Sequence, residues 1–430
     1  MKQEEIIALM KREVVPAIGC TEPMCVALCV AYATETLGRR PEQITVRLSA
    51  NILKNAMGVG IPGTGMVGLP IAIALGALIG KSEYQLQVLH DCTPQAVADG
   101  KELIAKGAIR IELEKKACDN LYVDVLCQAE GHSAQAVIAH EHTRLVYLCL
   151  DDRVITDERG CLQDGGETGT ADKLSLREVF DFAMQTPLEL LEFINEARTL
   201  NEKAAQEALK GNYGHELGKT LSRPLGKGIM GDSIFSHILS TTSCACDARM
   251  AGAMIPVMSN SGSGNQGIAA TLPVVVFAQE NHNTEEELTR ALVLSHLTAI
   301  YIKQSLGRLS ALCGCVVAST GSSCGITYLM GGNYEQVVYS VKNMIANLAG
   351  MVCDGAKPSC ALKVCSGVST AVLSAMLAIQ NKYVTNVEGL IEDDVDRCIL
   401  NLTRVGAKGM EETDRTVLDI MTHKAPAGEV

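Results

Sequence analysis

The sequence contains no tryptophan, and aromatic residues make up only 3% of its 430 residues. Charged residues are also scarce, at 20%, whereas 47% of the chain is hydrophobic. The shortage of charge excludes a largely disordered chain, because disorder needs a polar, charge-rich composition. The shortage of rings means that alanine, leucine, isoleucine, valine, methionine and cysteine fill the core, which suits closely packed helices.

An excess of positive charge is missing as well. Lysine and arginine number 37 against 49 aspartates and glutamates, so the formal net charge is -12 at pH 7. Nucleic acids and anionic membranes are bound through positive fields, so we expect neither as a partner. The longest apolar run, residues 66–80, contains glycine and proline and is shorter than the ~20 residues of a membrane span. We interpret it as a buried helix.

Disulfide bonds are not expected, although the chain contains 17 cysteines. The count is odd, and the first residues, MKQEEIIALM, show no cationic segment followed by an apolar one, as a secretory signal would. Reduced cysteines are typical of the cytoplasm. We therefore predict a cytoplasmic protein with free thiols.

Two periodicities divide the chain. Apolar and polar residues alternate in four runs, which predicts strands near 109–113, 121–126, 136–138 and 145–150. A further strand is expected at 44–48, and most other segments carry helix signals. We predict an α+β fold: a mainly helical catalytic domain formed by both ends of the chain, residues 1–100 and 174–430, with a small β-containing domain and its linker inserted at 101–173.

Individual helix boundaries follow from capping residues. Thr21 starts a helix that ends before Gly38, Thr93 starts another, and Thr284 with Glu287 forms a capping box. The helix after Thr284 and the segment 369–379 are apolar nearly all round. Helices of that kind are expected in the middle of a bundle.

Six of the cysteines cluster in sequence: Cys313, Cys315, Cys324, Cys353, Cys360 and Cys365. Thiols near glycine-rich turns in a reduced protein indicate zinc or an iron–sulfur cluster. Neither the paired C-x2-C motifs of a closed zinc site nor a ferredoxin C-x2-C-x2-C run is present. Cys353 and Cys360 instead flank a Gly/Pro loop that suits one centre, with a third ligand from elsewhere and one metal position open for substrate. Cysteines in apolar runs are expected to be core residues.

Two glycine-rich stretches are candidate anion sites. Residues 259–267, SNSGSGNQG, precede an apolar helix, so their amides and the helix N-terminus suit a carboxylate. Residues 55–68 contain five glycines. Close backbone packing is the alternative for both stretches. The first lacks the lysine of a P-loop and the strand-flanked dinucleotide pattern, which disfavours nucleotide phosphates.

Three motifs in this order resemble the L-cysteine desulfidase branch of the iron-sulfur L-serine dehydratase alpha-chain superfamily. They are Gly-Cys-Thr-Glu-Pro at 19–23, Ser-Gly-Ser-Gly-Asn-Gln-Gly at 261–267, and Met-Val-Cys-Asp-Gly-Ala-Lys at 351–357 with Cys-Ala-Leu-Lys at 360–363. The resemblance covers nearly the whole chain. It implies a mostly helical [4Fe-4S] enzyme of cysteine catabolism, a lyase that converts L-cysteine to hydrogen sulfide, pyruvate and ammonia.

The resemblance also implies roles for individual cysteines. Cys313, Cys353 and Cys360 become ligands of the [4Fe-4S] cluster, and Cys20 becomes the catalytic base. Cys315 stays an alternative to Cys313, because a loop shift of two residues exchanges them. A thiolate at a helix start is favoured by the helix dipole, which lowers its pKa.

The substrate is expected to contact the glycine-rich motif at 261–267. We expect Ser261, Ser263, Asn265 and Gln266 to orient the amino acid. Lys54 and Lys357 are the candidates for its carboxylate. No residue is predicted for the amino group.

Other functions stay open on sequence grounds. The same residues suit L-serine or another β-substituted amino acid, and a non-catalytic iron–sulfur or metal-binding protein is the alternative of another class. The expected partners are a small amino-acid substrate and a second copy of the chain in a homodimer.

Overall fold

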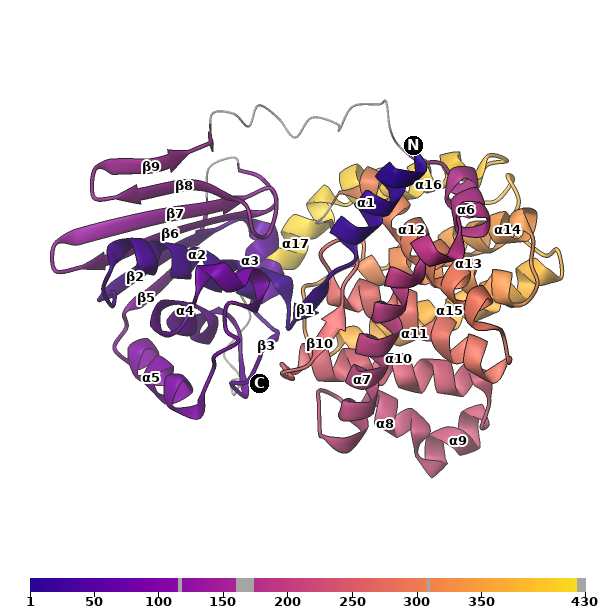
Figure 1. The fold of residues 1–430 in the computed structure, drawn as a ribbon, viewed down its shortest axis with the longest axis horizontal. Helices are drawn as coiled ribbons and strands as arrows, with labels where there is room; N and C mark the ends of the chain where they lie inside the picture. The colour runs from indigo at the N-terminus through magenta and orange to yellow at the C-terminus, as the bar shows by residue number, and fades with distance from the viewer. Residues whose placement is uncertain (115–117, 160–173, 308–309, 424–430) are drawn as a thin grey trace.

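The computed structural model describes residues 1–114, 118–159, 174–307 and 310–423 (Figure 1). The helices it describes are α1 (Gln3–Glu13), α2 (Thr21–Leu37), α3 (Ala50–Ala56), α4 (Leu69–Leu78), α5 (Pro94–Ala105), α6 (Leu176–Gln185), α7 (Asn195–Lys210), α8 (Leu217–Ser222), α9 (Pro224–Met230), α10 (Ile234–Met250), α11 (Gly264–Glu280), α12 (Glu285–Leu306), α13 (Gly314–Leu329), α14 (Tyr334–Leu348), α15 (Cys360–Ile379), α16 (Val395–Arg404) and α17 (Glu411–Thr422). The strands are β1 (Pro16–Ile18), β2 (Gln43–Leu48), β3 (Gly60–Ile61), β4 (Met66–Val67), β5 (Ile109–Leu113), β6 (Tyr122–Ala129), β7 (His132–Ala139), β8 (Leu145–Leu150), β9 (Arg153–Asp157) and β10 (Pro256–Met258). The predicted α+β, mainly helical fold class is confirmed.

A mixed six-stranded sheet forms the core of one lobe, in the order β5-β2-β6-β7-β8-β9. β2 pairs in parallel with β5 and antiparallel with β6, and the remaining strands follow as antiparallel neighbours. Glu130 and Gly131, both with positive φ, make the two-residue turn between β6 and β7, as the twist of a tight hairpin requires. The four predicted strands after residue 108 are confirmed, and β9 is an addition.

The sheet lobe includes much of the chain before residue 100. α2 packs against β6, β7 and β8, and α4 packs against α2 and α5 (Figure 1). The apolar residues of α2, α4 and the sheet form one core. The predicted domain boundary at residue 101 therefore passes through this core, because β2 joins the sheet by pairing with β5 and β6, which follow it by 65 to 85 residues. The predicted linker lies largely outside the described residues.

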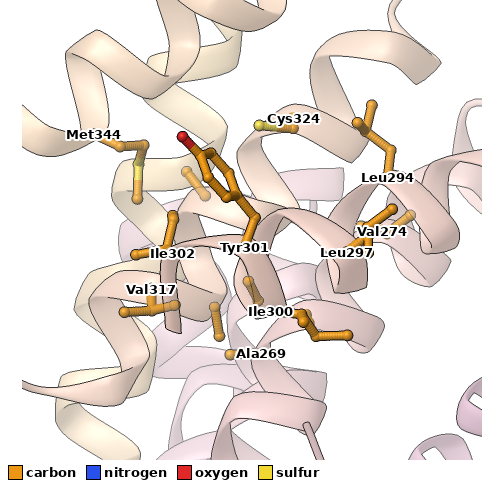
Figure 2. Close-up of a cluster of buried hydrophobic side chains, with 14 of the residues drawn as sticks. Ala269, Val274, Leu294, Leu297, Ile300, Tyr301, Ile302, Val317, Cys324 and Met344 are labelled. Atoms are coloured by element: carbon orange, nitrogen blue, oxygen red, sulfur yellow. The ribbon is translucent and has the colours of Figure 1, made fainter. Parts of the chain in front are cut away.

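The second lobe is helical and is built around α12, which is buried along most of its length. The capping box of Thr284 and Glu287 is present at its start. α13 packs against α11, α12, α14 and α15. Figure 2 shows part of this core, where the ring of Tyr301 projects between Met344 and Cys324.

α15 differs from the expectation of a helix buried all round. It is long and apolar enough to cross a membrane by length and composition, but half of that window is buried inside the protein. It packs against α10, α13 and α14. Its outer face exposes Leu373, Met376 and Leu377, each about half accessible.

Close helix packing in the second lobe depends on glycine. A Cβ atom added at Gly321 of α13 would lie 2.2 Å from the Ser295 carbonyl oxygen of α12. We expect Gly321→Ala to lower the free energy of unfolding by about 1–3 kcal/mol, because backbone rather than a flexible side chain must move. Urea unfolding measures the loss. Gly228→Ala, in α9 with no atom within 4 Å of the new Cβ, is the control and is expected to be neutral or stabilising.

The two lobes meet where distant segments pair. β1 forms a two-stranded antiparallel sheet with β10, and α17 packs against α3. Figure 1 shows α17, near the C-terminus, lying between the lobes. A Cβ atom at Gly60 would lie 2.3 Å from the Ala251 carbonyl carbon, so the glycine-rich segment 55–68 serves close backbone packing at this junction.

Candidate functional site

Cys20 lies at the junction, as the N-cap residue of α2. Its side chain is 2% exposed, and its Sγ is 2.9 Å from Glu22 Oε2, to which the thiol donates a hydrogen bond. The lowered pKa expected for a thiol at a helix start is wrong for Cys20: burial and the charge of Glu22 raise its pKa well above the ordinary value, and the charge of Arg249 acts in the opposite direction. The resting Cys20 is therefore a thiol whose proton is directed at a carboxylate.

Asn55, the residue before the end of α3, lies between Cys20 and Cys353. Its backbone oxygen is 4.0 Å from Cys20 Sγ, and its side-chain Oδ1 is 4.0 Å from Cys353 Sγ. Cys20 and Cys353, which lie more than 300 positions apart in the sequence, are thus both close to Asn55. The structure brings the predicted base and one predicted ligand to the same residue.

Cys313 and Cys353 come from two segments that pair with each other. Leu312 and Val352 form an isolated antiparallel bridge. The Cys313 amide donates to the Met351 oxygen at 2.9 Å, and the Cys353 amide donates to the Ala311 oxygen at 2.7 Å. Both cysteines are therefore held through backbone hydrogen bonds.

Cys360 is the first residue of α15 and follows the loop from Cys353. Gly355 in this loop has φ +86°, and a Cβ atom there would lie 2.2 Å from the Lys54 oxygen. Only glycine allows this close approach to α3. The Cys360 Sγ is 3.6 Å from the Gly355 oxygen, so the loop folds back toward the thiol.

The thiols influence one another electrostatically. A hydrogen bond with Cys315, helped by the charge of Lys363, lowers the pKa of Cys313 to about 7. Burial and the charge of Cys313 raise the pKa of Cys353 to about 11. Burial also raises the pKa of Cys360, and the Cys313 charge adds to it. The three predicted ligands therefore share one electrostatic environment.

The donor set at this site consists of soft thiols, the ligand type that iron–sulfur clusters take. Among the described residues, no three histidine, cysteine, aspartate or glutamate side chains are placed to hold a single metal ion. Lys54 and Lys363 act on Cys353 and Cys313 respectively. The positive charges of these two lysines favour the negatively charged, thiolate forms of the cysteines.

The glycine-rich stretch 259–267 contacts Thr21 and Gly314, the residues that follow Cys20 and Cys313. Thr21 Oγ1 donates to the Gly262 oxygen at 2.9 Å. A Cβ atom at Gly314 would lie 3.0 Å from Gln266 Cδ, so that side chain packs against the residue after Cys313. The hydroxyls of Ser263 and Ser261 make local hydrogen bonds, Ser263 as the N-cap of α11 and Ser261 to its neighbour's side chain.

His296 supports this motif from the core. Asn260 Nδ2 lies 3.1 Å from His296 Nδ1, and Thr271 Oγ1 lies 2.9 Å from His296 Nε2. Since the amide nitrogen can only donate, Nδ1 accepts and Nε2 carries the hydrogen. The Thr271 hydroxyl donates its own hydrogen bond to the Gly267 oxygen. The neutral ring thus connects both ends of the motif.

The buried His296 predicts a pH-dependent stability. Burial lowers its pKa from 6.5 to about 3, so below pH 6.5 the unfolded chain binds a proton that the folded chain does not. The contribution of the neutral His296 ring to the free energy of unfolding is therefore fully present above pH 6.5 and is lost as the pH falls toward 3. When the pH falls from 7.5 to 5.5, the free energy of unfolding should drop in both proteins. We expect the drop in His296→Gln to be about 1.4 kcal/mol smaller than that in the unsubstituted chain.

Urea unfolding at both pH values measures this difference, and titrations shared by the two proteins cancel. His423→Gln, on the exposed end of α17, is the control and is expected to follow the unsubstituted chain. Equal losses in the His296→Gln and unsubstituted proteins would contradict the assignment of a neutral buried imidazole.

The lysines predicted for a carboxylate have acidic partners instead. Lys54 is 1% exposed and forms an ion pair with Asp414 of α17. Lys357 forms an ion pair with Asp354 at 2.6 Å, and Lys363 also pairs with Asp354. These pairs hold α17 and the 353–360 loop in place. Both predicted lysines are thus engaged with protein carboxylates, and Lys357 shares its carboxylate with Lys363.

Sequence reasoning missed three residues at this site: Asn55, Cys246 and Arg249. The charges of Cys360 and Cys313 act on Cys246, whose pKa is raised chiefly by burial. Arg249 lies three residues later on α10 and donates from Nη1 to Asn265 Oδ1 at 3.0 Å. A single arginine at a helix end shows no sequence pattern, so only the structure connects it with the motif at 261–267.

A cavity of about 630 Å³ lies at the other end of α2. Its lining includes Thr34, Arg39, Thr93 and Asp99, and none of the predicted site residues. Because α2 has 17 residues, the cavity is roughly 25 Å from Cys20 along the helix. The cavity is thus separate from the thiol site.

Comparison with known proteins gives one family and several near relatives. The family model described as serine dehydratase alpha chain matches residues 83–419. A UPF0597 protein from Phocaeicola vulgatus is 66% identical over 427 residues, covering 98% of each chain. UPF0597 proteins from Bacteroides thetaiotaomicron and Oleidesulfovibrio alaskensis are 66% and 47% identical over 423 and 422 residues, again covering 98% of each chain.

Proposed function

The chain belongs to the serine dehydratase alpha chain family, and we propose that it is an iron–sulfur lyase that converts L-cysteine to hydrogen sulfide, ammonia and pyruvate. The observation that carries the proposal is the convergence at Asn55, whose two oxygens lie 4.0 Å from Cys20 Sγ and from Cys353 Sγ. A base and a metal ligand must border the same substrate for elimination to occur. This contact supports both assignments.

The three cysteines Cys313, Cys353 and Cys360 are the residues that would hold a [4Fe-4S] cluster. When bound, the cluster would supply an iron with an open position, a Lewis acid for the leaving group of the substrate. The paired backbone of residues 311–313 and 351–353 keeps two of the ligands in fixed positions. Cys360 reaches the same centre from the start of α15.

Cys20 takes the proton from the substrate Cα. Its own thiol proton must leave first, and Glu22 Oε2, 2.9 Å away, accepts the hydrogen bond of that thiol. Transfer of the proton to Glu22 leaves a thiolate, which the nearby positive charge of Arg249 favours. The Cα–H proton then moves to Cys20 while the C–S bond breaks and its electron pair leaves with the sulfur. The resulting aminoacrylate tautomerises and is hydrolysed to pyruvate and ammonia.

L-Serine is the second candidate substrate, because the family model is that of serine dehydratase. The arrangement of Cys20 and the three ligands applies equally to loss of hydroxide from the β-carbon.

Anaerobic reconstitution with iron and sulfide, followed by assay of L-cysteine and L-serine in parallel, tests the proposal. Pyruvate formed with equal sulfide from L-cysteine, at a higher kcat/KM than pyruvate from L-serine, supports the desulfidase. Preference for L-serine would instead assign a dehydratase. A bound cluster with neither product would indicate a non-catalytic iron–sulfur protein.

A further inference from the structure

Arg249 is a buried cation without an anionic partner. Its side chain lies in the last turn of α10 and the residue is 4% exposed. Arginine has several N–H donors, but among the described residues Arg249 makes one hydrogen bond, from Nη1 to Asn265, and no ion pair. Its Nε is buried without any hydrogen-bond partner. Buried arginines are ordinarily paired, so this arrangement is unusual for a purely structural residue.

The position of Arg249 connects both halves of the candidate site. Its charge acts on Cys20 and on Cys246, and Cys246 in turn interacts with Cys313 and Cys360. The Arg249 side chain also packs closely against the motif at 261–267, since a Cβ atom at Gly264 would lie 2.2 Å from Arg249 Nε. The cation is therefore adjacent to the proposed base and near the proposed ligands.

Gln266 provides a second buried group without a partner, of opposite polarity. Its Oε1 is a hydrogen-bond acceptor with no donor in the described part of the chain, and its side chain packs against Gly314. An unpaired donor of α10 thus packs against Gly264, two residues before the unpaired acceptor of Gln266. An α-amino acid offers the complementary pair, a carboxylate that accepts and an ammonium that donates.

We propose that Arg249 binds the α-carboxylate of the substrate and that Gln266 Oε1 accepts a hydrogen bond from its ammonium group. The inference rests on the proposed elimination reaction and defines its substrate class as zwitterionic α-amino acids. Guanidinium matches carboxylate through two parallel hydrogen bonds, which orients as well as binds. Held at both ends, the substrate presents its Cα–H to Cys20.

The test compares L-cysteine with L-cysteinamide, which keeps the ammonium but lacks the carboxylate. We expect the unsubstituted enzyme to prefer the acid by about 100-fold or more in kcat/KM. Arg249→Met is expected to bring this ratio within about tenfold, because without the guanidinium the site no longer recognises the carboxylate that distinguishes the two substrates. Gln266→Met is expected to weaken both substrates and keep the ratio, since both carry the ammonium.

A structural role would produce a different pattern. Arg290 is a matched control, a largely buried arginine that donates to the Ala183 and Thr186 oxygens far from the thiols. Arg290→Met is expected to lose stability but keep the preference for the acid. An active Arg249→Met enzyme that keeps the preference would overturn the proposal, and so would a Gln266→Met enzyme that loses it.

Calorimetric binding of L-alanine and L-alaninamide separates this inference from the proposed reaction, because neither compound carries a leaving group. We expect L-alanine to bind at least about tenfold more tightly than the amide, and Arg249→Met to remove the difference. This result supports the substrate class even where the elimination assay fails. No preference for L-alanine in the unsubstituted protein overturns it, even where elimination succeeds.

Discussion

Cys20→Ser is expected to reduce kcat for elimination by about 10³-fold or more while leaving the cluster in place. A general base contributes about 10² to 10⁴-fold, and a serine hydroxyl is a far weaker base than a thiolate. The substitution is nearly isosteric at a residue that is 2% exposed, and the new hydroxyl can keep the hydrogen bond to Glu22. The fold and the position of Asn55 should therefore survive. Steady-state sulfide release from L-cysteine measures the loss.

Visible absorption and the iron content per chain provide the control for this substitution. Both are expected to match the unsubstituted protein, because Cys20 is not a ligand in the proposed arrangement. Cys25→Ser, at a fully buried thiol one turn further along α2, is the matched variant and should retain turnover. Loss of the absorption in Cys20→Ser would show that Cys20 is a ligand rather than the base.

The fold could be predicted where local chemistry determines it. Gly38, with φ +70° at the end of α2, and the capping box at Thr284 are local signals, and both predicted boundaries are confirmed. The place of β2 inside the sheet is different. It depends on pairing with β5 and β6, which come much later in the chain, and one strand's alternation contains no information about its partners.

The sequence offers candidate cysteines for the site, but it does not reveal how the charges around them are paired. The family resemblance proposes roles for Cys20, Cys313, Cys353 and Cys360, because its motifs contain these cysteines at fixed positions. Whether a cation is available depends on its neighbours in space. Lys54 is matched by Asp414, 360 residues later, whereas Arg249 forms no ion pair within the described part of the chain, and no sequence pattern reveals either fact.

The surroundings of the two thiols favour Cys313 over Cys315 as the proposed cluster ligand. Cys315 is 4% exposed, and its Sγ lies 3.1 Å from Met351 Sδ and 3.4 Å from the Lys363 oxygen, so it is already surrounded by protein atoms. Cys313 is partly exposed and is the N-cap of α13, where the helix dipole favours a thiolate. The 3.4 Å contact between the two sulfurs then places Cys315 behind the ligand rather than at the metal.

Cys313→Ala is accordingly expected to abolish elimination and to remove most of the bound iron and sulfide, because two protein ligands remain where three are needed. Cys315→Ala is expected to keep the cluster and most of the turnover, and to lower the free energy of unfolding by about 1–2 kcal/mol through lost packing. Iron and acid-labile sulfide per chain after anaerobic reconstitution measure the difference, with Cys365→Ala, a partly exposed thiol of α15, as the control. If Cys315→Ala loses the cluster and Cys313→Ala keeps it, the ligand is Cys315, and Cys313 is the sulfur that supports it.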